Sequence, residues 1–133
     1  MLDFINKAIN KIFGTKSDKD IKEVMPYVEK ILAVYPTLQS ISNDQLRGKT
    51  QEFKARIAEY LKEVDGQMES LRAQAKDPNL DPDAKEVLYK QVDELQKQRD
   101  KQLEEVLLEL LPEAFAVVKE TARRFKENTS LTA

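Results

Sequence analysis

The sequence predicts an all-α protein, and three observations support this prediction. Charged residues make up 35% of the chain, whereas only three of its 133 residues are glycine. Apolar residues recur at intervals of three and four over long stretches, which is the period of an α-helix. Helix-capping residues and prolines separate these stretches. The chain is long enough for one domain with a modest hydrophobic core.

Composition excludes most kinds of catalytic site. The chain has no cysteine and no histidine, so disulfides, the usual Cys/His zinc sites, thiol nucleophiles and imidazole bases are all ruled out. Gly14, Gly48 and Gly66 are too far apart for a phosphate-binding loop, and no GxxxxGK[ST] motif occurs. The 22 basic and 24 acidic residues are interspersed, which disfavours nucleic-acid binding. We therefore predict that this chain is non-catalytic and holds no cofactor or metal.

No segment has the composition of a transmembrane helix. Every apolar run is well short of the ~20 residues needed to cross a bilayer. The N-terminus also lacks the continuous apolar core and cleavage site of a secretory signal. The sequence therefore predicts a cytoplasmic protein that touches a membrane only at its surface.

Residues 2–13 are expected to form a short amphipathic helix that ends at Gly14. One interpretation is a helix that binds a membrane surface or a partner, because apolar and aromatic residues opposite lysines suit the headgroup region of anionic lipids. The other is an ordinary helix packed on the protein's own core. The apolar face comprises Phe4, Ile5, Ala8, Ile9, Ile12 and Phe13, and the polar face comprises Asn6, Lys7, Asn10 and Lys11.

A second helix is predicted over residues 18–35. Ser17 is the expected N-cap, with Asp20 completing an acidic form of the capping box. Pro26 is expected to kink this helix without stopping it, because the apolar stripe continues in phase, and Pro36 is expected to end it. The stripe, interpreted as core, consists of Ile21, Val24, Met25, Val28, Ile31, Leu32 and Tyr35.

Two long helices, at about 43–76 and 82–111, are predicted to form an antiparallel hairpin. Ser42 and Gln45 match a capping box, and Asp81 followed by Pro82 marks the second start. When the two apolar stripes are paired, the position numbers of each pair have nearly the same sum, as facing residues of a hairpin must. The pairs are Ala75–Ala84, Leu71–Leu88, Met68–Val92, Val64–Leu95, Leu61–Arg99, Ile57–Leu103, Phe53–Val106 and Thr50–Leu110.

Arg99 interrupts this apolar seam. It is expected either to fix the register or to extend its stem along Leu61 towards a carboxylate such as Glu59 or Glu63. The base of the hairpin is expected to need support from the 21–35 and 112–126 helices, and its tip, around residues 70–90, to be mobile.

A last helix is predicted over 112–126, beginning at Pro112. More than half of its circumference is apolar, so it requires more cover than a two-helix hairpin provides. We expect it to fold back on the hairpin base, to pair with a second copy, or to pack on parts outside this chain. The apolar residues are Ala114, Phe115, Val117, Val118, Thr121, Ala122 and Phe125.

Three segments together resemble the amino-terminal region of the SecA family, the motor ATPases of bacterial preprotein export. These segments are KIFGTKSDKDIKEVMPYVEKILAVYP, LQSISNDQLRGKTQEFKARI and LLPEAFAVVKETARRF, in this order. The resemblance implies that this chain is a fragment of a longer motor that uses ATP and Mg²⁺. Its expected partners are the rest of the motor, the SecYEG channel, preproteins and anionic lipid at the cytoplasmic face of the inner membrane.

The resemblance also implies roles for particular residues. Residues 1–14 would bind membrane and channel, and residues 15–133 would form a helical scaffold with a projecting hairpin. The membrane-binding residues would be Phe4, Ile5, Lys7, Ile9, Lys11, Ile12 and Phe13. The residues that pack on the motor core or on a second copy would be Phe115, Val118, Ala122 and Phe125.

The segment between ARI and LLPEAF departs from the family pattern, which has a short acidic linker here. About 45 residues intervene in this chain, and no family role can be assigned to them. They are expected to form either a docking arm or a passive insertion. The alternative to a motor segment is a free-standing coiled-coil adaptor whose terminal helix dimerises; the gene downstream of Ala133 would distinguish the two.

Overall fold

The chain folds into four helices, as expected of an all-α protein. The computed structural model describes residues 2–128, except for the side chains of residues 2, 4, 10, 12 and 13. Within this range every regular element is an α-helix. In chain order they are α1 (Leu2–Phe13), α2 (Lys16–Gln39), α3 (Asn43–Ala75) and α4 (Pro82–Glu127). The described residues form two compact units, residues 42–111 and residues 2–41 with 112–128.

The start of α2 differs from the prediction. Thr15 is the N-cap, not Ser17: its Oγ1 accepts a hydrogen bond from the Asp18 amide at 3.1 Å, and Asp18 accepts one from the Thr15 amide at 2.9 Å. Both candidate pairs have the capping-box spacing. Gly14 decides between them, because its φ of 73° ends α1 and places Thr15 at the cap.

Two prolines that were expected to break helices lie inside them instead. α2 continues past Pro36 to Gln39, and α4 runs through Pro112, so the predicted 82–111 and 112–126 helices are one. A proline inside a helix costs ~3 kcal/mol because it removes one hydrogen bond. Packing beyond each proline offsets this cost: Leu38 is buried after Pro36, and Pro112 and Ala116 are both buried. Pro26 does not interrupt α2 either, as predicted.

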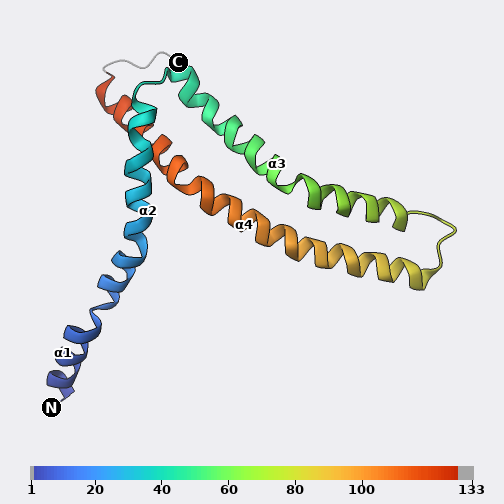
Figure 1. Cartoon of the computed structure of the whole chain (residues 1–133), viewed down its shortest axis with the longest axis horizontal. Helices are drawn as coiled ribbons and strands as arrows, with labels where there is room; N and C mark the ends of the chain where they lie inside the picture. Colours follow the sequence, from blue (N-terminus) through green and yellow to red (C-terminus); the bar gives the residue numbers. More distant parts are fainter. Residues whose placement is uncertain (1, 129–133) are drawn as a thin grey trace. The chain divides into compact units, whose positions relative to one another are not determined.

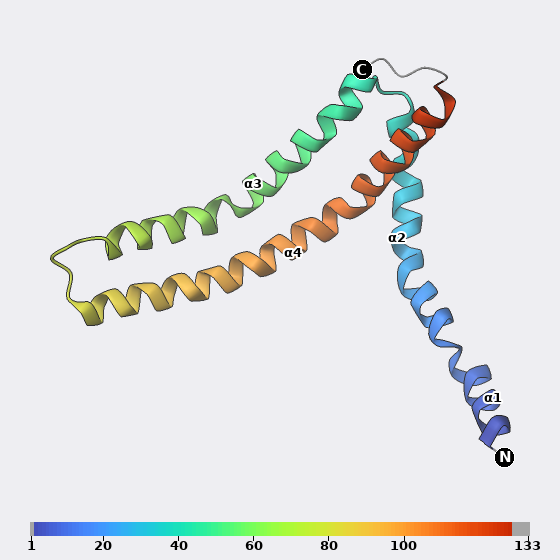
Figure 2. The same ribbon diagram turned by 180° about the vertical axis from the view of Figure 1, so that it is seen from behind.

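Residues 42–111 form the predicted antiparallel hairpin, in which α3 and the first part of α4 lie side by side (Figures 1 and 2). Its core consists of predicted seam residues from both helices. Thr50 is the exception, because it is exposed and lies outside the seam. The buried cluster is Leu61, Val64, Met68 and Val92, and Ile57, Leu71, Leu95 and Leu103 pack against it.

Polar contacts cross the hairpin on either side of this core. The Nε atom of Arg99 lies 2.5 Å from Oδ1 of Asp65, so Arg99 faces α3 as the register requires. The expected partners, Glu59 and Glu63, were wrong: the carboxylate that Arg99 reaches is Asp65, one helical turn beyond Leu61 on α3. Closer to the base, the hydroxyl of Tyr60 donates to Glu105 at 3.2 Å.

The loop between α3 and α4 is held by its own side chains. The amide of Asn79 donates to Asp77 at 2.9 Å, and the amide of Asp83 donates to the Asp81 carboxylate at 3.1 Å. The second bond caps α4, which begins at Pro82 as predicted. Short Asx-type contacts therefore close the arm without a glycine.

Candidate functional site

The first candidate site is the amphipathic helix α1. Ile5 and Ile9 on its apolar side are each about half exposed, and Lys7 and Lys11 on the other side are exposed. The helix places Phe4, Ile12 and Phe13 on the same apolar side by sequence, but their side chains lie outside the described residues. α1 therefore presents unpaired apolar side chains opposite two cations.

Within residues 2–128, no helix is both long enough and apolar enough to cross a bilayer. The same range contains no group of three or more Asp or Glu side chains placed to hold a metal ion.

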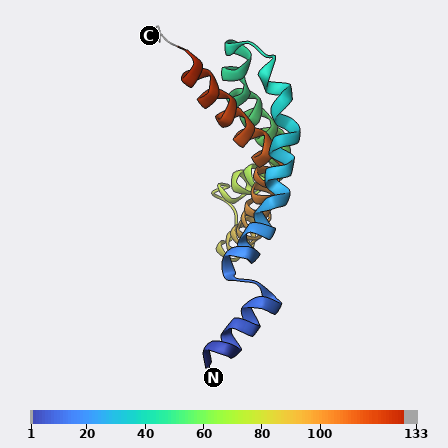
Figure 3. The ribbon, with the colours of Figure 1, turned by 90° about the vertical axis from the view of Figure 1, so that its left-hand side faces the viewer.

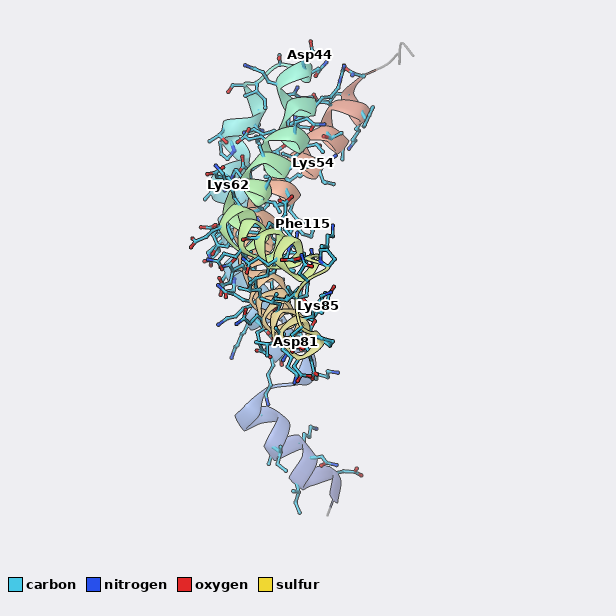
Figure 4. All side chains as sticks on the ribbon, turned by 90° about the vertical axis from the view of Figure 1, so that its right-hand side faces the viewer. Asp44, Lys54, Lys62, Asp81, Lys85 and Phe115 are labelled. Atoms are coloured by element: carbon cyan, nitrogen blue, oxygen red, sulfur yellow. The ribbon has the colours of Figure 1, made fainter. Side chains whose placement is uncertain are left out.

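The second candidate site is the apolar face of the last turns of α4. Phe115, Val118 and Phe125 are 57%, 67% and 59% exposed, and Ala122 between them is also exposed. Figure 4 labels Phe115 on this part of the chain. The predicted face is thus present and uncovered within the part of the chain that the structure describes. Exposed apolar patches of this kind mark interaction surfaces.

The opposite face of the same turns carries a buried charge. Glu120 has no exposed surface, and it lies next to Ala116, which is also fully buried. Two hydrogen bonds from Arg123, at 2.6 and 3.0 Å, and one from Arg124, at 2.7 Å, satisfy its carboxylate. A buried carboxylate needs such partners, because an unpaired charge in the interior is very costly.

Arg124 extends this cluster to α2, which lies beside these turns of α4 (Figures 1 and 3). Its Nη2 donates to the carbonyl oxygens of Leu38 at 3.0 Å and Ile41 at 2.7 Å. The Leu38 carbonyl is in the last turn of α2, where helix carbonyls lack intrahelical partners and the helix dipole is negative, and Ile41 follows two residues after the helix ends. The ammonium of Lys119 also lies over the ring of Tyr35, 4.5 Å from its centroid.

The electrostatics of the cluster follow from these contacts. Hydrogen bonds from Arg123 lower the pKa of Glu120 to about 2; burial opposes this shift, and hydrogen bonds from Arg124 and Tyr35 add to it. Glu120 and Glu127 in turn raise the pKa of Arg123. The carboxylate is therefore ionised at neutral pH, and the cluster is an ion pair and not a proton donor.

Sequence reasoning missed this cluster. The letters ETARR place Glu120 three and four residues before the two arginines, which is also the spacing of ordinary solvated pairs on a helix surface. Only the packing of α2 decides that this pair is buried. The sequence held one signal of a buried charge: Glu120 lies in a helix whose apolar face is too wide for a helix on the protein surface.

Comparison with known proteins identifies the family. A profile of the SecA DEAD-like domain matches residues 9–132, which include the hairpin. The chain belongs to the SecA family. It is 46% identical over 123 residues to the protein translocase subunit SecA of Parabacteroides distasonis and 48% identical over 126 residues to that of Amoebophilus asiaticus. The SecA of Christiangramia forsetii is 45% identical over 130 residues.

These relatives cover almost all of this chain, but the chain covers little of them. The three alignments span 92%, 94% and 98% of the chain and 11%, 11% and 12% of the relatives. The predicted resemblance to an amino-terminal SecA segment is therefore confirmed. No solved structure matches the chain.

The ion-pair cluster predicts an acid-sensitive stability. Because the folded-state pKa of Glu120, about 2, lies below its ordinary value of 4.5, the cluster stabilises the fold fully above that value. This stability is lost as the pH falls from 4.5 towards 2. Urea unfolding from pH 7 to pH 3 should show a steeper loss in the native chain than in Glu120→Gln. Equal pH dependence of the two proteins would contradict the low pKa.

Proposed function

We propose that this chain is the membrane tether and scaffold of a SecA-type ATPase, which moves preproteins through the SecYEG channel. The observation that carries the proposal is α1, whose half-exposed Ile5 and Ile9 lie opposite Lys7 and Lys11 in a chain that belongs to the SecA family. Family membership favours this function over that of a free-standing adaptor. ATP and Mg²⁺ would bind to the rest of the motor.

α1 would act at the cytoplasmic face of the inner membrane. Its apolar side would enter the headgroup region, and the two lysines would contact anionic headgroups. Each lysine near an anionic surface contributes ~1 kcal/mol, and each buried apolar side chain contributes ~1.5–3 kcal/mol. A helix of this size therefore gives reversible attachment.

The exposed apolar face of α4 would serve as the contact to the rest of the motor. Phe115, Val118 and Phe125 are all more than half exposed. A helix face that stays in water is normally polar, so three large apolar side chains on one face indicate a contact surface. The buried Glu120 cluster supports this role because it fixes the opposite face of α4 against α2. The contacts with α2 would thus bury one face of α4 and leave its apolar face free to contact the rest of the motor.

Vesicle co-sedimentation tests the tether. The chain should bind anionic vesicles, and Lys7→Gln with Lys11→Gln should lower that affinity at least tenfold, because each lysine contributes ~1 kcal/mol. Ile5→Asn with Ile9→Asn should abolish binding, whereas the control Tyr89→Asn, which replaces an exposed hairpin residue, should not. Equal binding to neutral and anionic vesicles, or none to either, would reject the tether.

The α4 contact is tested by comparing two chain lengths. In the 133-residue chain, Phe115→Ser with Val118→Ser should change the free energy of unfolding by less than ~0.5 kcal/mol, because both side chains are exposed. In a SecA chain that carries this segment with its motor, the same pair should cost ~3 kcal/mol or more. Lys126→Ser, on the exposed last turn, is the control. No additional cost in the longer chain would contradict the contact.

A further inference from the structure

One face of α4, within the hairpin unit 42–111, carries an open patch of leucine side chains. Leu107 and Leu108 are 47% and 46% exposed, and Leu103 and Leu111 are half-buried beside them. The residues that line the patch all belong to α4, and they are Asp100, Leu103, Glu104, Leu107, Leu108 and Leu111. We call this surface the leucine patch.

The leucine patch lies beside the hairpin seam and not in it. Residues 100, 104, 107, 108 and 111 follow one another at intervals of one, three and four, so they share one face of α4. The seam is the neighbouring face, where Val106 and Leu110 are buried. Of the patch residues, Leu103 is the one that also packs against the hairpin core. Folding of the hairpin therefore leaves Leu107 and Leu108 in contact with water.

The charged residues that line the leucine patch are both acidic. Asp100 and Glu104 are exposed and lie one helical turn apart at its edge. Asp100 accepts a hydrogen bond from the neutral side chain of Gln96 at 2.8 Å, which leaves its charge uncompensated. Residues 100–111 contain four acidic residues and one basic residue, so their net charge is −3. The basic residue, Lys101, is exposed and does not line the patch.

The basic residues that precede the patch are paired with other acids. The ammonium of Lys97 lies 2.7 Å from the carboxylate of Glu94. The guanidinium of Arg99 lies 2.5 Å from the carboxylate of Asp65 on α3. Neither cation therefore neutralises the acidic edge of the leucine patch, and this edge can attract cations from another molecule.

We infer that the leucine patch docks a basic amphipathic helix of another protein. The patch extends over ~17 Å of α4, the length of a helical segment of about 12 residues. Apolar side chains of the partner at intervals of three and four would cover Leu107, Leu108 and Leu111. Lysine or arginine side chains beside them would pair with Asp100 and Glu104.

The charge of the patch selects this partner over the other surfaces that an apolar patch can meet. Anionic lipid and nucleic acid would be repelled by Asp100 and Glu104, and an acidic helix would be repelled in the same way. The leucine patch is thus distinct from α1, whose lysines suit an anionic surface. It also belongs to a different compact unit from Phe115 and Val118, which we assign to the contact with the motor.

Peptide binding to the 133-residue chain tests the docking surface. The probe is a labelled peptide of leucine and lysine, ~14 residues long, with leucines at intervals of three and four. The comparison peptide has glutamate at each lysine position. In fluorescence anisotropy the lysine peptide should bind about tenfold more tightly, because Asp100 and Glu104 attract it and repel the other. Added salt should weaken this binding.

Replacing the exposed leucines tests the apolar part of the surface. Leu107→Gln with Leu108→Gln should weaken binding of the lysine peptide about tenfold, because both contact side chains lose their apolar surface. The matched control is Val87→Gln with Tyr89→Gln, which are 54% and 52% exposed on the same helix and should bind as the native chain does. Glutamine is a good helix former, and circular dichroism checks that each variant stays helical.

Neutralising the acidic edge tests the charged part. Asp100→Asn with Glu104→Gln should weaken binding of the lysine peptide about fivefold and remove most of its salt dependence. The control is Glu63→Gln with Glu69→Gln, which removes the same charge from exposed positions of α3. This control should change the affinity less than about twofold, because both residues lie outside the patch.

Three results would overturn the docking surface. Equal losses in the Leu107 and Val87 double variants would mean that the peptide adsorbs without a site. Loss of binding in Phe115→Ser with Val118→Ser, but not in the leucine variant, would place the peptide on the last turns of α4. In a SecA chain that carries this segment with its motor, the peptide should bind as tightly; loss of binding there would mean that the motor covers the patch. Vesicle binding by α1 is measured without the peptide, so failure of either proposal leaves the other intact.

Discussion

The fold of residues 1–41 with 112–128 depends on one constraint: a buried carboxylate must have its charge satisfied inside the protein. Glu120 meets this constraint with Arg123 and Arg124, and Arg124 in turn donates to the carbonyls of Leu38, in the last turn of α2, and of Ile41 just after it. The same guanidinium thus neutralises a buried charge and supplies hydrogen bonds that a helix end lacks. Replacing Glu120 would remove the buried carboxylate that both arginines bond. The cluster therefore fixes both the rotation of α4 and the end of α2.

This arrangement explains why the last turns of α4 bury a charged residue and expose apolar ones. The face turned towards α2 carries Glu120, whereas Phe115 and Val118 are exposed. A helix that only needed to pack on α2 would bury its phenylalanines. Because the charged cluster fixes α4 against α2, the apolar residues stay available for another surface. We propose that this surface belongs to the rest of the motor, because the chain covers about a tenth of its SecA relatives.

The elements set by local periodicity could be predicted from the sequence, whereas those set by tertiary packing could not. The hairpin register was predictable because apolar residues recur along both helices and the short loop between them fixes which residues can face each other. Pro36 and Pro112 were misjudged because local rules count the lost hydrogen bond but not the burial of Leu38 or Ala116 beyond it. The choice of Thr15 over Ser17 as N-cap depended on the backbone of Gly14, a detail that spacing alone does not contain.

The candidate sites also divide into those that follow from local periodicity and those that depend on tertiary packing. The amphipathic character of α1 and the apolar face at Phe115, Val118, Ala122 and Phe125 were predictable, because both follow from which residues share a helix face. The Glu120 cluster was not, because its spacing is that of any surface pair and its burial depends on α2.

A double-mutant cycle between Glu120 and Arg124 tests the central claim most directly. The free energy of unfolding would be measured in urea at pH 7 for the native chain, Glu120→Gln, Arg124→Met and the double variant. The account predicts a coupling energy of at least ~1.5 kcal/mol, because hydrogen bonds between buried charged groups contribute that much. Costs that add to within ~0.3 kcal/mol would contradict it, because the two residues would then act independently.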